Sequence, residues 1–109
     1  MVFVVIAHDG KDAEAPARRM AVRPRHMERV GPCAERGEIL AGIALLDRPE
    51  GGMVGSVLVV DLPDEAAVRA WLAEDPYMKD GVWKDVTILP GRIAPLPYRP
   101  LPGTAPAKG

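Results

Sequence analysis

Apolar residues cluster along this chain in short runs, and stretches with helical spacing lie between the runs. Val2 to Ala7 is entirely apolar, and Glu38 to Leu46, Val54 to Asp61 and Val82 to Leu89 are further short, largely apolar segments bounded by turn residues. Runs of this length with many β-branched residues are typical of strands. The pattern therefore predicts four strands.

The region between the first two strands has a helical composition that prolines interrupt. Asp12 to Met20 is rich in Ala and Arg, and a regular helix there is expected to begin near Pro16. A second helical segment is predicted from Pro24, in its first turn, to about Arg36. Within it, Pro32 would cost about 3 kcal/mol in a straight helix, so we expect a kink or a restart.

A further helix is predicted between the third and fourth strands. Pro63 followed by Asp64 and Glu65 favours a helix start, because acidic residues there complement the helix dipole. Pro76 disfavours the helical conformation for the residue before it, so the helix should end at Glu74. The order β-α-β-β-α-β predicts a ferredoxin-like α+β fold with a four-stranded antiparallel sheet.

The length and the distribution of proline suggest one domain and a tail. We expect residues 1–92 to form a single α+β domain and residues 93–109 to form an extended, proline-rich C-terminal arm. At 109 residues, the chain is near the size at which a partner subunit adds much of the buried surface.

Two of the predicted strands are apolar on both faces, in Val2 to Ala7 and in Val57 to Val60. Two helices can cover only one face of a four-stranded sheet, and an uncovered apolar face is unusual in a monomer. A second copy of the same face is the simplest cover, which predicts a homodimer formed through the sheet.

The charge balance and the single cysteine restrict the choice of partners and compartment. Lys and Arg number 14 against 15 for Asp and Glu, so we expect no nucleic-acid partner and instead a small organic ligand. Cys33 cannot form an intrachain disulfide, which fits a reducing compartment. We find no run long enough to cross a bilayer and no basic segment of a signal peptide, so we expect a cytoplasmic protein without a membrane partner.

Two side chains remote in sequence are candidates for proton chemistry. His26 is one of two histidines, and Asp75 precedes Pro76 and Tyr77. The ordinary pKa of histidine, roughly 6.5, is close to neutral pH, and a carboxylate that orients the ring would complete an acid/base pair. On sequence alone, His26 could equally be a surface helix residue and Asp75 a turn former.

Three further residues are candidates for ligand binding. The planar guanidinium of Arg23 could hold a carboxylate or phenolate, or pair with a surface acid. Asp9 is expected to cap the following helix or form its turn, with a place beside His26 as the alternative. Ser56 could offer its hydroxyl to a ligand. His8 and Asp9 are adjacent on a strand and point to opposite faces, so we expect no metal site.

These motifs together resemble a known family. The resemblance covers Met1 to about Pro90 and lies in Ala21-Val22-Arg23-Pro24 followed by His26, Gly55-Ser56, Trp71, Asp75-Pro76-Tyr77 and Gly81-Val82, with Asp9 after the first strand. They are similar to the signature of the YCII-related (YciI-like) proteins.

The resemblance implies a subunit of the dimeric α/β-barrel superfamily, with a pocket in which His26 and Asp75 form the active-site dyad. One characterised type of relative eliminates chloride from a chlorinated hydroxyquinol, and structural cousins include muconolactone isomerases and small monooxygenases.

The resulting hypothesis is a small dimeric enzyme. His26, oriented by Asp75, would move a proton on a small aromatic or unsaturated acid, in lyase, isomerase or dehalogenase chemistry that requires no cofactor. Arg23, Asp9 and Ser56 would bind the substrate. The alternative is a non-catalytic module with the same fold that binds a small molecule or a protein, with the proline-rich arm docking on a partner or on the other subunit.

Overall fold

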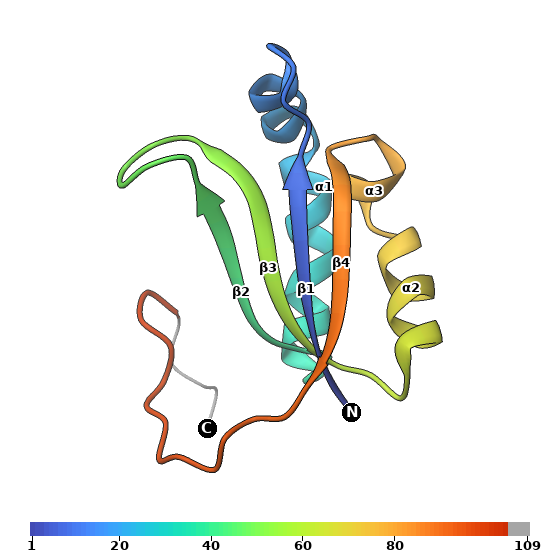
Figure 1. Cartoon of the computed structure of the whole chain (residues 1–109), viewed down its shortest axis with the longest axis vertical. Coiled ribbons are helices and arrows are strands. Elements are labelled where there is room, and N and C mark those ends of the chain that lie inside the picture. Colours follow the sequence, from blue (N-terminus) through green and yellow to red (C-terminus); the bar gives the residue numbers. More distant parts are fainter. Residues whose placement is uncertain (105–109) are drawn as a thin grey trace.

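The computed structural model describes residues 1–104, which fold into one layer of strands and one layer of helices (Figure 1). The elements in chain order are β1 (Val2–Asp9), α1 (Ala15–Glu35), β2 (Ile39–Leu46), β3 (Met53–Asp61), α2 (Glu65–Ala73), α3 (Pro76–Lys79) and β4 (Trp83–Gly91). The predicted strands are therefore present with ends shifted by one or two residues, and α3 is a short helix that the sequence did not indicate.

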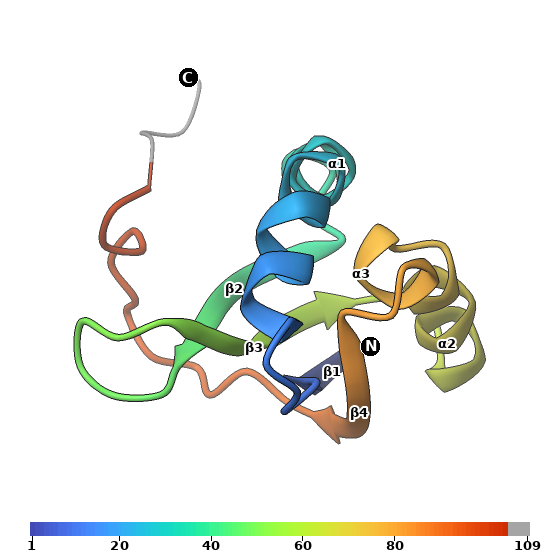
Figure 2. The same cartoon turned by 90° about the horizontal axis from the view of Figure 1, so that it is seen from above.

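The four strands form one antiparallel sheet in the order β2-β3-β1-β4. Val5 on the central strand β1 pairs with Leu58 of β3 on one side and with Ile88 of β4 on the other. All three helices lie on the same face of this sheet (Figure 2). This is the predicted ferredoxin-like βαββαβ topology.

Helix α1 differs from the prediction, because it is one helix rather than two. Pro24 and Pro32 both lie inside it, so the predicted start at Pro24 and the predicted restart at Pro32 are wrong. Each proline removes one hydrogen bond, to the carbonyl of Met20 or of Glu28. Both prolines and both of these residues are exposed, so water can satisfy the freed carbonyls while the opposite face of α1 remains packed.

The helix ends have identifiable causes. Gly37 follows α1 with a φ of 82°, and the Gly37 and Glu38 amides donate to the carbonyls of Ala34 and Cys33, which is the Schellman arrangement. Asp64 caps α2 by accepting a hydrogen bond from the Ala67 amide at 2.8 Å. The predicted start of α2 is confirmed, and its end at Ala73 is one residue before the predicted end.

The hydrophobic core lies between the sheet and the helices. Phe3, Val5 and Ala7 of β1 belong to the buried cluster that forms it, together with Val68 and Leu72 of α2. Cys33 is buried at the edge of this core, as its apolar neighbours suggested. Toward one end of the sheet the inward positions become polar, and the candidate site lies there.

The face of the sheet opposite the helices is apolar over much of its centre, where Thr87 beside Ile6 is a polar exception. Val4 and Ile6 of β1, Val57 and Val59 of β3 and Leu89 of β4 occupy the outward positions, and the pairing sets them side by side. No helix among residues 1–104 covers this face (Figure 2). The prediction that a second apolar face requires a cover is therefore consistent with the register.

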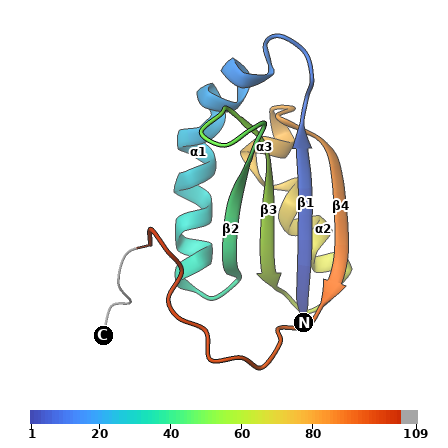
Figure 3. The same cartoon turned by 60° about the vertical axis from the view of Figure 1, so that its left-hand side comes forward.

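The segment after β4 carries no helix or strand within the described residues. It runs from the end of β4 past the ends of the strands and reaches the side of α1 and β2 (Figure 3). Residues 105–109 of the predicted arm, including Pro106, lie outside the described residues. No helix within residues 1–104 has both the length and the apolarity needed to cross a bilayer.

Candidate active site

His26 lies on the inward face of α1, one helical turn after Val22, and both side chains are buried. Its Nδ1 is 2.8 Å from Oδ1 of Asp75, the carboxylate that accepts this hydrogen bond. The two residues are 49 positions apart in the sequence. The imidazole and the carboxylate therefore meet as expected, and both side chains are buried.

Asp75 is held in place by the start of α3. It is the N-cap residue, with an extended backbone, and Oδ1 also accepts a hydrogen bond from the Tyr77 amide at 2.9 Å. Oδ2 accepts a hydrogen bond from Nη1 of Arg29 at 3.0 Å. Asp75 is completely buried, so its carboxylate depends on these donors in place of water.

Arg29 connects three elements around Asp75. Besides the carboxylate, it donates through Nη2 to the backbone carbonyl of Trp71 at 2.6 Å, and its guanidinium lies 4.6 Å from the centre of the Trp71 ring. It therefore fixes α1 to the end of α2 and places a positive charge beside Asp75. The sequence reasoning missed Arg29, since nothing local marks it as different from the other arginines of α1.

Aromatic rings hold the imidazole from two sides. The Tyr77 ring stacks on His26 with 3.9 Å between ring centres and an angle of 13° between the planes. Trp83 meets His26 edge-on at 5.7 Å. Burial raises the pKa of the Tyr77 phenol, so Tyr77 is an uncharged wall of the site at neutral pH.

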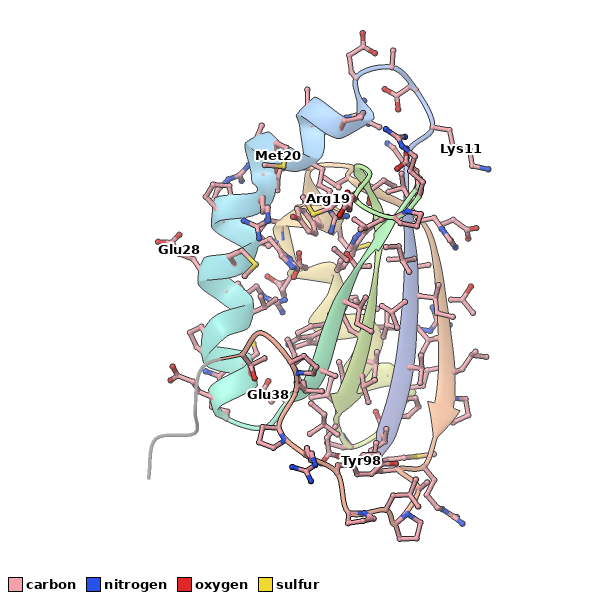
Figure 4. All side chains as sticks on the ribbon, turned by 90° about the vertical axis from the view of Figure 1, so that its left-hand side faces the viewer. Lys11, Arg19, Met20, Glu28, Glu38 and Tyr98 are labelled. Carbon is pink, nitrogen blue, oxygen red and sulfur yellow. The ribbon has the colours of Figure 1, made fainter. Side chains whose placement is uncertain are left out.

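A second polar network lies next to this one and is centred on Arg19. Its Nη1 donates to both carboxylate oxygens of Asp9, at 2.9 and 3.1 Å, and its Nη2 donates to Oγ of Ser56 at 2.9 Å. The Trp83 indole also donates to Ser56 Oγ, at 3.3 Å, and the Arg19 guanidinium lies 4.8 Å from the Tyr77 ring centre. Figure 4 shows Arg19 between α1 and the strands, with Glu28 on the outer side of the helix.

The expected capping role of Asp9 is wrong. Glu14 is the N-cap residue of α1, and its side chain makes no capping hydrogen bond. Asp9 is instead buried at the end of β1 and paired with Arg19. The reason is tertiary, because α1 returns along the sheet and brings Arg19 onto the strand end.

A cavity of about 420 Å³, here called the α1–β2 groove, lies between α1 and the strands β2 and β3. Its polar residues are Arg19, Arg23, His26, Ser56, Tyr77 and Thr104, and its apolar residues are Met27, Val30, Gly31, Ala34, Ile39, Gly42, Ile43, Ala44, Met53 and Leu58. Asp75 is behind His26 and does not line the groove. A ligand in the groove would therefore meet the imidazole, and the imidazole in turn meets the carboxylate.

The predicted binding residues are distributed unequally around this groove. Arg23 and Ser56 line it, whereas Asp9 does not and contacts it only through Arg19. Arg19 and Tyr77 also line it, and no binding role was predicted for either. A continuous α1 would have indicated Arg19, because positions 19, 23, 26 and 30 then share one face.

A second cavity, of about 320 Å³, lies near the turn after β1 and is lined by His8, Asp9, Gly10, Lys11, Asp12, Ala15, Pro16, Met53 and Val54. It contains none of the residues that surround the imidazole. Within residues 1–104, no group of three or more His, Cys, Asp or Glu side chains has an arrangement that could hold a metal ion.

The fold and the buried His–Asp pair define a ferredoxin-like α+β domain with a groove on the helix side of its sheet. The YCII-related domain family matches residues 1–92, and the chain belongs to this family. It is 28% identical to Protein YciI of Escherichia coli, over 83% of this chain and 95% of that protein. It is 33% identical, with the same coverage of each chain, to an uncharacterised protein of Haemophilus influenzae.

Two solved structures share the fold. The first is 5-chloro-2-hydroxyhydroquinone dehydrochlorinase (TftG) of Burkholderia phenoliruptrix in complex with 2,5-dihydroxybenzoquinone, with a TM-score of 0.76 and 19% identity over 86% of this chain and 96% of that one. The second is an antibiotic biosynthesis monooxygenase, with a TM-score of 0.51 and 19% identity over 87% and 100%. These likenesses show that the chain shares the α+β fold of both structures, with one four-stranded antiparallel sheet.

Proposed function

We propose that this protein is a small enzyme in which His26 moves a proton on an aromatic or unsaturated acid bound in the α1–β2 groove. The observation that carries the proposal is the buried hydrogen bond between His26 Nδ1 and Asp75, formed by an imidazole that also lines a cavity. A base needs to be within reach of its substrate and held in one orientation. The contacts with Asp75 and Tyr77 fix the ring of His26, and its place in the wall of the groove supports access to a bound substrate.

The contacts of His26 indicate the role of each ring nitrogen. Nδ1 donates to Asp75, which selects the tautomer with a proton on Nδ1 and a lone pair on Nε2. Nε2 would then accept a proton from a hydroxyl or an activated C–H group of the substrate. The proton would return to the substrate in an isomerisation, or the electron pair would expel a leaving group in an elimination. Asp75 stabilises the imidazolium that forms between these steps.

The other polar groups would bind and orient the acid. Arg23 is exposed at the groove and supplies a guanidinium for a carboxylate or phenolate. Ser56 lines the groove with its hydroxyl fixed by Arg19 and Trp83, and Asp9 would act indirectly by holding Arg19. The likeness to the TftG dehydrochlorinase supports elimination as one reaction class within this proposal. None of the proposed steps uses a cofactor.

The test is the substitution His26→Asn, assayed on phenolic and unsaturated acids first found by thermal shift. Asn places an amide N–H near the position of Nδ1, so the hydrogen bond to Asp75 can remain while Nε2 is lost. We expect turnover to fall by about 100-fold or more. Met20→Ala, on the exposed side of α1, is the control and should leave turnover unchanged.

Unchanged turnover in His26→Asn would rule out the mechanism. Ligand binding without turnover by the wild-type protein would instead favour the non-catalytic binding module.

The proposal includes a homodimer and a cytoplasmic location. The outward positions of β1, β3 and β4 form an apolar face that no element within residues 1–104 covers, which supports pairing of two copies through this face. The single buried cysteine supports a reducing compartment.

A further inference from the structure

The α1–β2 groove is long and divided by polarity. Along α1 it begins at Arg19, Arg23 and His26 and continues over Val30 to Ala34. At 1.5 Å per residue, Arg19 and Ala34 are about 22 Å apart along the helix. The charged residues of α1 that line the groove are all in the first half of this length, and the α1 residues that line the second half, Val30, Gly31 and Ala34, are apolar.

Small residues on both walls make room in the apolar half. Gly31 of α1 has no other atom within 4 Å of the position where a Cβ would lie. Gly42 of β2 faces the same space, and a Cβ there would lie 3.3 Å from the Leu58 side chain. Ala34 and Ala44 also line this half. Isoleucine or leucine at these positions would fill the apolar half of the groove. The open space therefore results from the small side chains on both walls.

The polar half has unused hydrogen-bonding capacity for an anion. Arg19, Arg25 and Arg29 each pair with an aspartate, whereas Arg23 makes no ion pair within residues 1–104. Arg19 is 4% exposed and lines the groove, and its Nε has no acceptor among the described residues. Because that Nε is enclosed by protein atoms, the guanidinium that a ligand anion can reach at this end is that of Arg23.

We propose that the ligand is an amphiphilic carboxylate, with its acid group at Arg23 and His26 and an apolar chain lying over Gly31 and Gly42. This inference rests on the proposed function, since it assigns the substrate class of the same site. A compact single-ring acid at Arg23 would reach His26 but leave the space at Gly31, Ala34 and Leu58 empty. The apolar half therefore selects acids that carry an extension beyond the reacting group.

The experiment measures the affinity of the wild-type protein for butanoate, hexanoate and octanoate by calorimetric titration at neutral pH. Burying each methylene in the groove should strengthen binding about fourfold. An affinity that is the same for all three acids would overturn the proposal.

Two substitutions locate the two ends of the ligand. Gly31→Leu places a side chain in the open space of the apolar half, so octanoate should lose at least about tenfold in affinity while butanoate binds as before. Gly31→Ala, which adds one methyl group, is the matched control and should have a small effect. Arg23→Gln should lower the affinity for all three acids by a similar factor. If Gly31→Leu lowered the affinity for all three acids equally, the position assigned to the apolar chain of the ligand would be wrong.

The outcome also separates this inference from the proposed chemistry. If affinity rises with chain length and Gly31→Leu removes the rise, the inference holds even when no acid is turned over. If His26→Asn abolishes turnover of a single-ring acid and chain length has no effect, the proposed function holds and the amphiphilic ligand is wrong.

Discussion

Arg29 lies outside the cavity, yet it provides the positive charge beside the buried carboxylate of Asp75. The Asp75 carboxylate is completely buried, and Arg29 is the cation bonded to the oxygen that His26 does not use. Without that cation, a buried negative charge would rely on the imidazole and one amide alone. Arg29 is thus a positioning residue for the dyad and a contributor to stability.

Replacing Arg29 by Ala should lower the free energy of unfolding by about 2 kcal/mol, because it leaves a buried carboxylate short of a charged partner. The measurement is urea denaturation followed by tryptophan fluorescence. Arg25→Ala is the matched control four residues earlier on α1. The side chains of Arg25 and its partner Asp80 are 59% and 39% exposed, so the loss of free energy of unfolding should stay below about 0.5 kcal/mol. Similar losses in both variants would contradict the role assigned to Arg29.

At the residue level, sequence reasoning was more informative for polar groups with few equivalents than for abundant ones. His26 and Asp75 could be selected because the chain has two histidines and one Asp-Pro-Tyr turn. Arg29 could not, because it is one of many arginines and only the approach of α1 to α3 distinguishes it. Arg19 could be selected only if α1 were taken as one continuous helix.

Helix α1 carries most of the candidate site, and its continuity is what aligns the site residues. The helix runs through Pro24 and Pro32, so Arg19, Arg23, His26 and Val30 line one groove. A helix that began at Pro24, as the local pattern predicts, would have no fixed register between Arg19 and His26. A proline predicts a helix boundary from local energetics alone, whereas here the packing of the opposite face outweighs the local cost.

Replacing Pro32 by Ala tests the cost of a proline inside α1. The substitution restores an amide that can donate to the carbonyl of Glu28, so we expect the free energy of unfolding to rise by about 1–2 kcal/mol. Thermal and urea denaturation would measure the change.

Pro63→Ala is the control, since Pro63 precedes the cap of α2 and is exposed. Pro63→Ala should lower the free energy of unfolding by about 0.4–1 kcal/mol, because alanine gives the unfolded chain more conformational freedom. Destabilisation by Pro32→Ala would show that α1 needs the proline.

The whole molecule has an asymmetry between the two faces of its sheet. The helices, the core and the α1–β2 groove are on one side. The other side presents Val4, Ile6, Val57, Val59 and Leu89, and no helix among residues 1–104 lies over it. Burying this face against its own copy would remove apolar surface from water at each strand, which is the physical basis of the proposed dimer.

Sedimentation velocity at micromolar concentration should give twice the chain mass for the wild-type protein. Ile6→Lys places a charge in the middle of the proposed interface and should give a monomer with an unchanged circular dichroism spectrum. Met20→Lys changes an exposed methionine on α1 and should remain dimeric. A monomeric wild-type protein, or a dimeric Ile6→Lys, would refute the proposed interface.

The sequence by itself indicated the order of the four strands, the antiparallel ferredoxin-like sheet, and His26 and Asp75 as candidates for proton chemistry. Apolar runs, capping residues and rare polar groups are local signals, and they can be interpreted without knowing which segments meet. The tertiary structure decided that α1 is continuous, that Asp9 binds Arg19 in place of capping a helix, and that Arg29 joins Asp75. These outcomes depend on the free energy of contacts between segments far apart in the chain, which no local pattern encodes.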